Sequence, residues 1–265
     1  MKVVLITGAS SGIGKAIGDY LCQNGYLVYG TSRNPNHYPN SKFELLSVDV
    51  RDTVSIKSAV SYIIKKSGRL DVVINNAGVG ITGALEEIPN SEIRNNFDVN
   101  FFGPIDVIKA VLPQMRLQNS GLIINITSIA GYMGLPYRSV YSASKGALEL
   151  MTEAISMEVK PFGISICNVA PGDFATNIAA GRYHAPISEN SAYTKYPSIL
   201  NEMNAHVDGG DNPNEMAIAI RRIIETKKPQ LHYKVGAFMQ KFSVILKRIL
   251  PDLWFEKMMM NHYKL

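Results

Sequence analysis

Cysteine is scarce in this sequence, with only Cys22 and Cys167 among 265 residues. Two cysteines are too few for a disulfide framework, and their spacing is not that of a metal site. Cys22 falls in a helical pattern and Cys167 in an apolar, strand-like run, which indicates two reduced core residues. The sequence therefore argues against small disulfide-rich and zinc-binding proteins, and we expect no metal.

Long apolar runs and long basic runs are also missing. No stretch approaches the roughly 20 consecutive apolar residues that a membrane span needs, and the first strand-like run starts at Lys2, which leaves no room for a signal peptide. The formal net charge is +5, but the basic residues are scattered along the chain. We therefore expect a soluble, cytoplasmic protein that does not bind nucleic acid.

The sequence does contain a regular alternation of strand and helix patterns. With 46% hydrophobic residues, the chain can bury a large core. Strand patterns, several of them continuous apolar runs typical of parallel strands buried on both faces, cover residues 3–6, 27–31, 43–48, 70–74, 122–126, 164–170 and 231–235. We predict a doubly wound, Rossmann-type parallel sheet of about seven strands flanked by helices, forming one domain over residues 1–265.

Three regions between and after these strands lead to more specific predictions. A helical pattern from about Ser91 to Leu117 is expected to be interrupted at Pro104 and Pro113. Residues 173–212 form a long polar region, which predicts a substrate loop or lid. Residues 236–265 predict a helical C-terminal extension, divided by Pro251.

The first strand leads directly into the glycine-rich segment Thr7–Gly14 and then into a helical pattern. A glycine-rich turn at a helix start lets backbone amides approach a pyrophosphate, which the helix N-terminus also attracts. The glycine spacing is Gly-x-x-x-Gly-x-Gly, which differs from the commoner Gly-x-Gly-x-x-Gly. We predict a dinucleotide site that includes Gly8, Ser10, Ser11, Gly12, Ile13 and Gly14.

The ends of the next strands indicate which dinucleotide binds. The second strand ends in Ser32-Arg33 rather than in an acidic residue, which favours the 2′-phosphate of NADP(H) over NAD(H). Asp49 and Val50 follow the third strand, where a carboxylate could accept a bond from the adenine amino group. Asn76, Ala77 and Gly78 follow the fourth, where small side chains let the backbone approach the ribose.

Tyr141 and Lys145 stand four residues apart in a helical pattern, so they share one helix face. A nearby cation favours the charged form of a tyrosine, which could then exchange a proton with an alcohol or ketone. Such pairs are common on exposed helices, so the pair gains weight only from the nucleotide site. Ser128 follows the fifth strand, at the sheet edge where ligands bind in open α/β folds.

Taken together, these motifs resemble the short-chain dehydrogenase/reductase family over nearly the whole chain, in particular its 17β-hydroxysteroid and retinol dehydrogenase-like branch. The resemblance implies that Tyr141 is the general acid/base, that Lys145 supports it and binds the nicotinamide ribose, and that Ser128 polarises the substrate oxygen. It implies that Asn100 holds a water in a proton relay. It also places Pro171, Gly172, Phe174 and Thr176 at the nicotinamide, and implies a homodimer or homotetramer formed by the helices that carry Asn100 and Tyr141.

The resulting prediction is an NADP(H)-dependent oxidoreductase that interconverts a ketone or aldehyde and an alcohol on a small apolar substrate. The alternatives are a catalytically silent NADP sensor and a nucleic-acid-binding protein. Apolar residues in the C-terminal extension could cover the substrate cleft, contact another subunit or lie on a membrane. We favour the first two and do not expect membrane contact. This apolar set comprises Phe238, Phe242, Ile245, Leu246, Ile249, Leu253, Trp254 and Met258.

Overall fold

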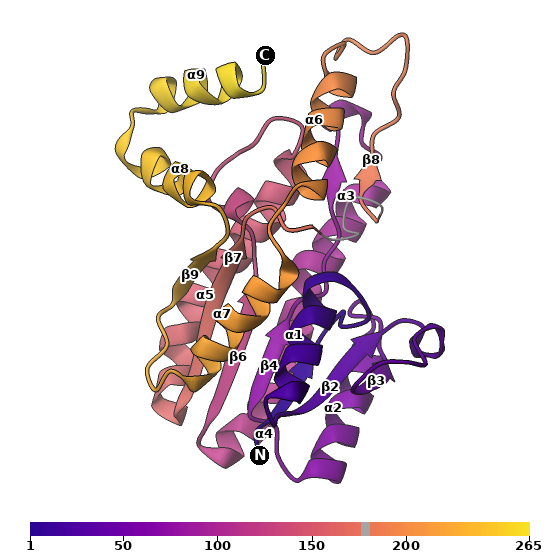
Figure 1. Ribbon diagram of the computed structural model, residues 1–265, viewed down its shortest axis with the longest axis vertical. Helices are drawn as coiled ribbons and strands as arrows, with labels where there is room; N and C mark the ends of the chain where they lie inside the picture. Colours follow the sequence, from indigo (N-terminus) through magenta and orange to yellow (C-terminus); the bar gives the residue numbers. More distant parts are fainter. Residues whose placement is uncertain (176–180) are drawn as a thin grey trace.

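The computed structural model describes residues 1–175 and 181–265 (Figure 1). One sheet of seven parallel strands has the order β3-β2-β1-β4-β6-β7-β9. This confirms the predicted doubly wound sheet. The strands are β1 (Val3–Ile6), β2 (Leu27–Ser32), β3 (Glu44–Ser47), β4 (Val72–Asn75), β6 (Gly121–Ile126), β7 (Ile164–Pro171) and β9 (His232–Val235).

Helices cover both faces of this sheet, which explains why its central strands are apolar on both sides. On one face, α1 (Gly12–Gln23) and α7 (Pro213–Glu225) enclose a core that includes Ile17, Leu21 and Ile220. On the other face lies a second core, which includes Ile63, Val111 and Val159. Its helices are α2 (Thr53–Ser67), α4 (Gly103–Gln118) and α5 (Ser139–Val159).

The strand order reverses direction beside β1. The chain runs outward from β1 through β2 to β3, and then crosses back to β4 on the other side of β1. In open parallel sheets, such a switch point leaves a crevice at the carboxyl ends of the strands, where ligands bind. The topology therefore places a candidate site above the ends of β1 and β4.

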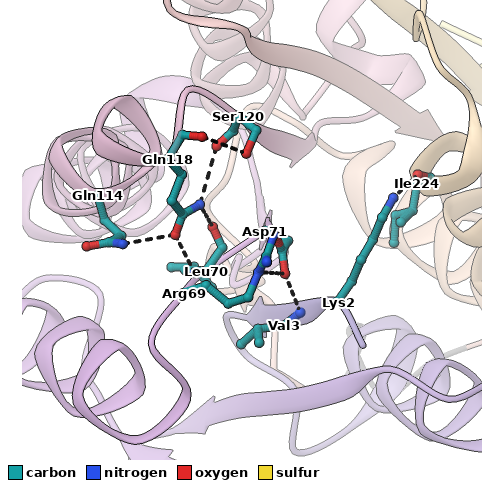
Figure 2. A network of polar contacts seen from close by, with 9 residues as sticks. All are labelled: Lys2, Val3, Arg69, Leu70, Asp71, Gln114, Gln118, Ser120 and Ile224. Carbon is teal, nitrogen blue, oxygen red and sulfur yellow. Dashed lines mark hydrogen bonds and ion pairs between the residues drawn. The ribbon is translucent and has the colours of Figure 1, made fainter.

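The opposite edge of the sheet, at the amino ends of β1, β4 and β6, is closed by polar contacts (Figure 2). The Asp71 carboxylate accepts a bond of 2.8 Å from the Val3 amide and pairs with Arg69. The Gln118 side chain accepts from the Leu70 amide and donates to its carbonyl, both at 2.9 Å. These contacts pair backbone groups at the start of β1 and beside the start of β4.

The helical segment around residue 100 differs from the prediction. Helix α3 (Asn90–Phe97) continues through the π-helical segment η3 (Asp98–Phe102) into α4, so the irregular stretch precedes Pro104. Pro104 lies in the first turn of α4, where proline is tolerated. Helix α4 also runs through Pro113, whose neighbours Val111 and Met115 are fully buried. Packing therefore maintains the helix where proline alone predicts a break.

The region predicted as a loop contains regular structure. Helix α6 (Tyr196–Asp208) buries Tyr196, Ile199, Leu200 and Met203 against Val140 and Tyr141 of α5. These four residues have the i, i+3, i+4, i+7 spacing of a helix, a signal masked by the polar residues around them. Upstream, β8 (Tyr183–His184) pairs in parallel with β5 (Ile81–Thr82).

The C-terminal extension is helical, as predicted. Helix α8 (Phe238–Ile249) is followed by α9 (Asp252–His262), and Pro251 stands between them. Both helices project beyond the carboxyl ends of β7 and β9 in Figure 1. Short helical turns complete the fold at η1 (Pro35–His37), η2 (Leu85–Glu87), η4 (Ile129–Tyr132) and η5 (Lys160–Phe162). Across residues 1–175 and 181–265, no helix is long and apolar enough to cross a membrane.

Candidate active site

The glycine loop between β1 and α1 requires glycine for steric reasons. Gly8 has a φ of +64°, and a Cβ there would lie 2.9 Å from the Cα of Ala77. At Gly14, a Cβ would lie 2.5 Å from the Gly8 carbonyl oxygen. Ser11 precedes α1 without capping it through its side chain. The loop therefore lies close to the segment after β4 and leaves first-turn amides of α1 available to an anion.

A cleft of about 480 Å³ runs from this loop along the carboxyl edge of the sheet, a size typical of ligand sites. Most of the predicted cofactor residues line it: Gly8, Ser10, Ser11, Gly12, Ile13, Ser32, Arg33, Asp49, Val50, Asn76, Ala77, Gly78, Tyr141, Lys145 and Pro171. Gly14 lies in the first turn of α1, where the Asn76 side chain leaves no room for a Cβ. Thr176 lies outside the described residues.

At one end of the cleft, two guanidinium groups stand beside Asp49. Arg51 binds both carboxylate oxygens of Asp49, with Nε 3.0 Å from Oδ1 and Nη2 2.5 Å from Oδ2. Hydrogen bonds from Arg51 lower the pKa of Asp49, and the charge of Arg33 acts in the same direction. Arg33 and Arg51 both line the cleft. Arg51 was not predicted from the sequence as a residue of this site, although it follows Asp49 by two residues.

Close packing of two glycines brings α5 against the turn that follows Ser128. A Cβ at Gly146 of α5 would lie 2.9 Å from the Gly131 carbonyl oxygen, so larger residues would push these segments apart. Ser128 caps η4, and its Oγ accepts from the Ala130 amide at 3.2 Å. As a result, Ser128 and Tyr141 line one pocket together with Gly172 and Phe174.

Tyr141 lines both this pocket and the long cleft, so it stands where the two meet. Lys145, one turn later on α5, is only 5% exposed, and its Nζ donates to the Ile126 carbonyl at 2.9 Å. Burial lowers the pKa of Lys145, whereas the charges of Tyr141 and Glu149 act against this shift. A buried ammonium thus lies one turn from a tyrosine at the junction of two cavities.

Asn100 lies in the π-helical segment η3, and such segments are frequent at functional sites. Its Oδ1 accepts from the Val79 amide and its Nδ2 donates to the Val79 carbonyl, both at 2.9 Å. A Cβ at Gly78 would lie 3.2 Å from Asn100 Oδ1 and 3.5 Å from Lys145 Nζ. Asn100 therefore holds the segment after β4 beside Lys145. Its role in a water relay stays a prediction.

A buried carboxylate behind Lys145 was missed by the sequence analysis. Glu149 is 5% exposed and accepts a hydrogen bond from the Thr127 hydroxyl. Its Oε2 lies 2.9 Å from each of the Tyr132 hydroxyl, Asn168 Nδ2 and His232 Nδ1. The i+4 spacing from Lys145 was the signal that could have found it.

The pocket lined by Ser128 and Tyr141 also contains charged side chains that no sequence motif indicated. The guanidinium of Arg138 lies 5.3 Å from the centre of the Tyr141 ring. Arg182 is buried, and its pKa is lowered by burial and by the charge of Arg138. Asp173 also lines the pocket, and its Oδ2 accepts from Gln240 of α8 at 2.7 Å. Arg138, at the start of α5, thus meets two charged residues from the segment that follows β7.

Comparison with known proteins gives consistent matches. The family model for short chain dehydrogenases matches residues 2–186. The 3-ketodihydrosphingosine reductase of Bacteroides thetaiotaomicron is 43% identical over 95% of this chain and 94% of its own length. Human 17-beta-hydroxysteroid dehydrogenase type 1 is 30% identical over 94% of this chain and 81% of its own.

Solved structures agree with these sequence matches. A short-chain dehydrogenase from Streptomyces avermitilis superimposes with a TM-score of 0.81 at 34% identity, covering 100% of this chain and 97% of the other. Further structures of similar fold were solved with 5-hydroxy-NADP, with NADP and with NAD. The fold thus has counterparts that bind nicotinamide dinucleotides.

Proposed function

Because the chain belongs to the short-chain dehydrogenase family, we propose that it is an NADP(H)-dependent oxidoreductase that interconverts a ketone or aldehyde and an alcohol. The observation that carries this proposal is the position of Tyr141, which lines both the long cleft and the pocket beside it. A proton donor at that junction lies next to both the cofactor and the substrate.

The residues along the cleft fit a phosphorylated dinucleotide. The glycine loop and the first turn of α1 offer backbone amides to a pyrophosphate. Arg33 and Arg51 stand at the end where the adenosine ribose would lie. Guanidinium groups bind phosphate in a bidentate manner, and we assign this role to Arg33, because Arg51 is already bound to Asp49 and Asn95. Ser32 stands where an acidic residue at the end of β2 would repel a 2′-phosphate, and the Asp49 carboxylate at this end is paired with Arg51. These features support NADP(H) over NAD(H).

When bound, the nicotinamide would exchange hydride with the carbonyl carbon, and the protein supplies the proton. In the reductive direction, the Tyr141 hydroxyl donates its proton to the carbonyl oxygen, and the Ser128 hydroxyl holds that oxygen by a hydrogen bond. The buried ammonium of Lys145 stabilises the phenolate that results. Asn100 would hold the water that restores the proton.

Four further residues would position the nicotinamide. Pro171 lines the cleft, while Gly172 and Phe174 line the adjoining pocket with Ser128 and Tyr141. This placement supports the predicted contacts with the nicotinamide ring and its carboxamide. The same role is proposed for Thr176, which follows Phe174 by two residues.

The substrate we propose is 3-ketodihydrosphingosine or a close analogue. The similarity to the Bacteroides reductase over nearly the whole chain supports this choice. The pocket also fits a ketone that carries a polar group beside the carbonyl, because Arg138, Asp173 and Arg182 offer both donors and an acceptor near Tyr141. A purely apolar carbonyl compound would cover these charged groups without offering them any polar contact.

We also propose a homodimer or homotetramer built through α4 and α5. Leu117 of α4 and Leu150 and Met157 of α5 are exposed apolar residues on these two helices, which supports a subunit contact there. A monomeric mass in light scattering would contradict this assembly.

The proposed function is tested by following nicotinamide absorbance with 3-ketodihydrosphingosine and with NADPH or NADH in parallel. We expect turnover with NADPH to exceed that with NADH. We expect Tyr141→Phe to abolish turnover while leaving NADPH binding, measured by fluorescence, unchanged. Turnover by the Phe variant would contradict the mechanism, and a preference for NADH would contradict the role of Arg33. NADPH binding without turnover of any carbonyl compound would indicate a nucleotide sensor instead.

A further inference from the structure

Helix α8 has two faces with different surroundings. On the inner face, Gln240 donates to Asp173 in the substrate pocket, and Val244 packs into a small core with Ile129 and Met133. The outer face carries an apolar stripe at i, i+4, i+7 and i+11, which the spacing places on one side of the helix. This α8 stripe consists of Phe238, Phe242, Ile245 and Ile249.

The α8 stripe is directed away from the protein. Phe238 and Ile249 are each 73% exposed, and the rings of Phe238 and Phe242 stack with their centres 5.8 Å apart. Two more exposed apolar residues follow in the first turn of α9, where Leu253 and Trp254 are 76% and 69% exposed. Contiguous exposed apolar residues of this size mark interaction surfaces. The six residues together are the C-terminal apolar surface.

Basic residues border this surface. Residues 236–265 contain five lysines and arginines but only two acidic residues. Asp252 pairs with Lys247, and Lys264 pairs with Glu202 of α6. Lys241 and Arg248 lie seven residues apart along one side of the α8 stripe, and within the described chain neither forms an ion pair. An apolar stripe edged by cations is the pattern of helices that lie in the surface of an anionic bilayer.

Two other occupants fit the surface less well. The surface does not cover the substrate pocket, because the residue of α8 that bonds to the pocket residue Asp173 is Gln240, on the opposite face of the helix. A second copy packed as an antiparallel helix pair would bring the Lys241 and Arg248 side of each helix against its own equivalent, so that like charges would meet. An anionic lipid surface satisfies the apolar residues and the cations together.

We propose that α8 and the first turn of α9 form a docking surface for anionic lipid bilayers, with the α8 stripe, Leu253 and Trp254 in the interfacial layer. This differs from our expectation from sequence, which did not favour membrane contact. Docking would place the substrate pocket about one helix diameter, roughly 10 Å, from the lipid surface. In Figure 1, α8 and α9 extend from the body of the protein at this end. The proposal does not depend on the identity of the substrate.

The test is co-sedimentation of the full chain with vesicles, at low and at high salt. One set contains phosphatidylglycerol and phosphatidylcholine in equal parts, and the other contains phosphatidylcholine alone. We expect the wild type to bind the anionic vesicles, with weaker binding at high salt and to the neutral vesicles. The combined variant Phe238→Gln, Ile249→Gln and Trp254→Gln should bind at least tenfold more weakly, since it loses three large apolar contacts.

Matched variants separate charge from apolar contact. Lys241→Gln with Arg248→Gln should weaken binding to anionic vesicles about tenfold and leave binding to neutral vesicles unchanged. Val54→Gln with Leu85→Gln removes two exposed apolar residues elsewhere and should bind as the wild type does. Because every apolar position changed is exposed, the thermal unfolding temperature of these variants should not fall. If it does fall, the single substitutions are tested for vesicle binding instead.

Three outcomes would overturn the proposal. The first is a wild type that does not sediment with anionic vesicles. The second is equal binding by the wild type and by the combined apolar variant. The third is a concentration-dependent dimer in light scattering that the apolar variant loses, because this would show that a second copy covers the surface. Since binding is measured without turnover, these outcomes are distinct from a failure of the proposed reaction.

Discussion

The two edges of the sheet use similar polar residues in opposite ways. At the amino edge, the side chains of Asp71 and Gln118 form hydrogen bonds with backbone groups at the start of β1 and beside the start of β4 (Figure 2). At the carboxyl edge, Arg33 and Arg182 line cavities, and across residues 1–175 and 181–265 neither forms an ion pair. Polar groups that bond to each other stabilise the fold, whereas charged groups that line a cavity without an ion pair can bind a ligand there.

The comparison implies that stability and activity depend on different edges. Substitutions at the amino edge should lower the free energy of unfolding and leave turnover intact. Substitutions at the carboxyl edge should lower turnover and leave the free energy of unfolding unchanged or higher. Groups positioned to bind a ligand do not also stabilise the free protein.

The largest effect is expected for Lys145→Met at the carboxyl edge. Turnover should fall about 10²- to 10⁴-fold, the range associated with loss of acid/base assistance. The free energy of unfolding should stay equal or rise at neutral pH, because methionine removes a buried charge. Activity assays and urea unfolding of the same preparation measure both quantities. A loss of stability in proportion to the loss of activity would contradict the view that the carboxyl edge serves activity and not stability.

The pH dependence of stability sharpens this prediction. Burial lowers the pKa of Lys145 in the folded protein below its ordinary value of 10.5. Between the folded and the unfolded pKa, the unfolded chain binds more protons, so the wild type gains stability as the pH rises through this window. The Met variant lacks this contribution. The stability difference between the two proteins should therefore shrink as the pH approaches 10.5.

An intermediate effect, on stability and not on activity, is expected for Asp71→Ala at the amino edge. The side chain of Asp71 is 10% exposed, and its loss leaves the Val3 amide without its acceptor. The free energy of unfolding should fall by about 1–3 kcal/mol, while kcat/KM stays within about twofold of the wild type because Asp71 lies at the far edge from the cleft. Chemical unfolding and steady-state rates measure these values.

The matched control is Arg69→Ala, which removes the partner of Asp71. Arg69 is 54% exposed, so its loss should cost less than about 1 kcal/mol. If Arg69→Ala were as destabilising as Asp71→Ala, the ion pair and not the bond to the Val3 amide would be the important contact.

The sequence revealed the parts of the fold and site that depend on local signals. Apolar runs located the seven strands, and the glycine spacing located the loop at β1, since a side chain at Gly8 or Gly14 would collide with neighbouring segments. The motif residues Ser128, Tyr141 and Lys145 do meet at the two cavities. Their catalytic roles remain predictions until variants are measured.

The sequence did not reveal features that tertiary packing creates. Arg138, Asp173 and Arg182 come together only because α5, the end of β7 and the segment before β8 converge on one pocket. Helix α6 was not predicted, because its four buried apolar residues lie in a segment rich in polar residues. The outer face of α8 was expected to be covered, and only the folded chain shows that Gln240 turns inward while the α8 stripe turns outward.

The smallest effect is expected for Glu149→Gln. This variant tests whether a buried carboxylate that lines neither cavity affects activity, as the groups at the carboxyl edge do, or only stability. The charge of Glu149 raises the pKa of Lys145 against the effect of burial. Removing that charge should lower the pKa of Lys145, so the decline of kcat/KM for ketone reduction at high pH should begin at a lower pH. Glu153→Gln is the matched control, because Glu153 contacts His232 from the same helix but is 46% exposed. An unchanged pH profile in Glu149→Gln, with a loss of stability alone, would place Glu149 with Asp71 as a structural carboxylate.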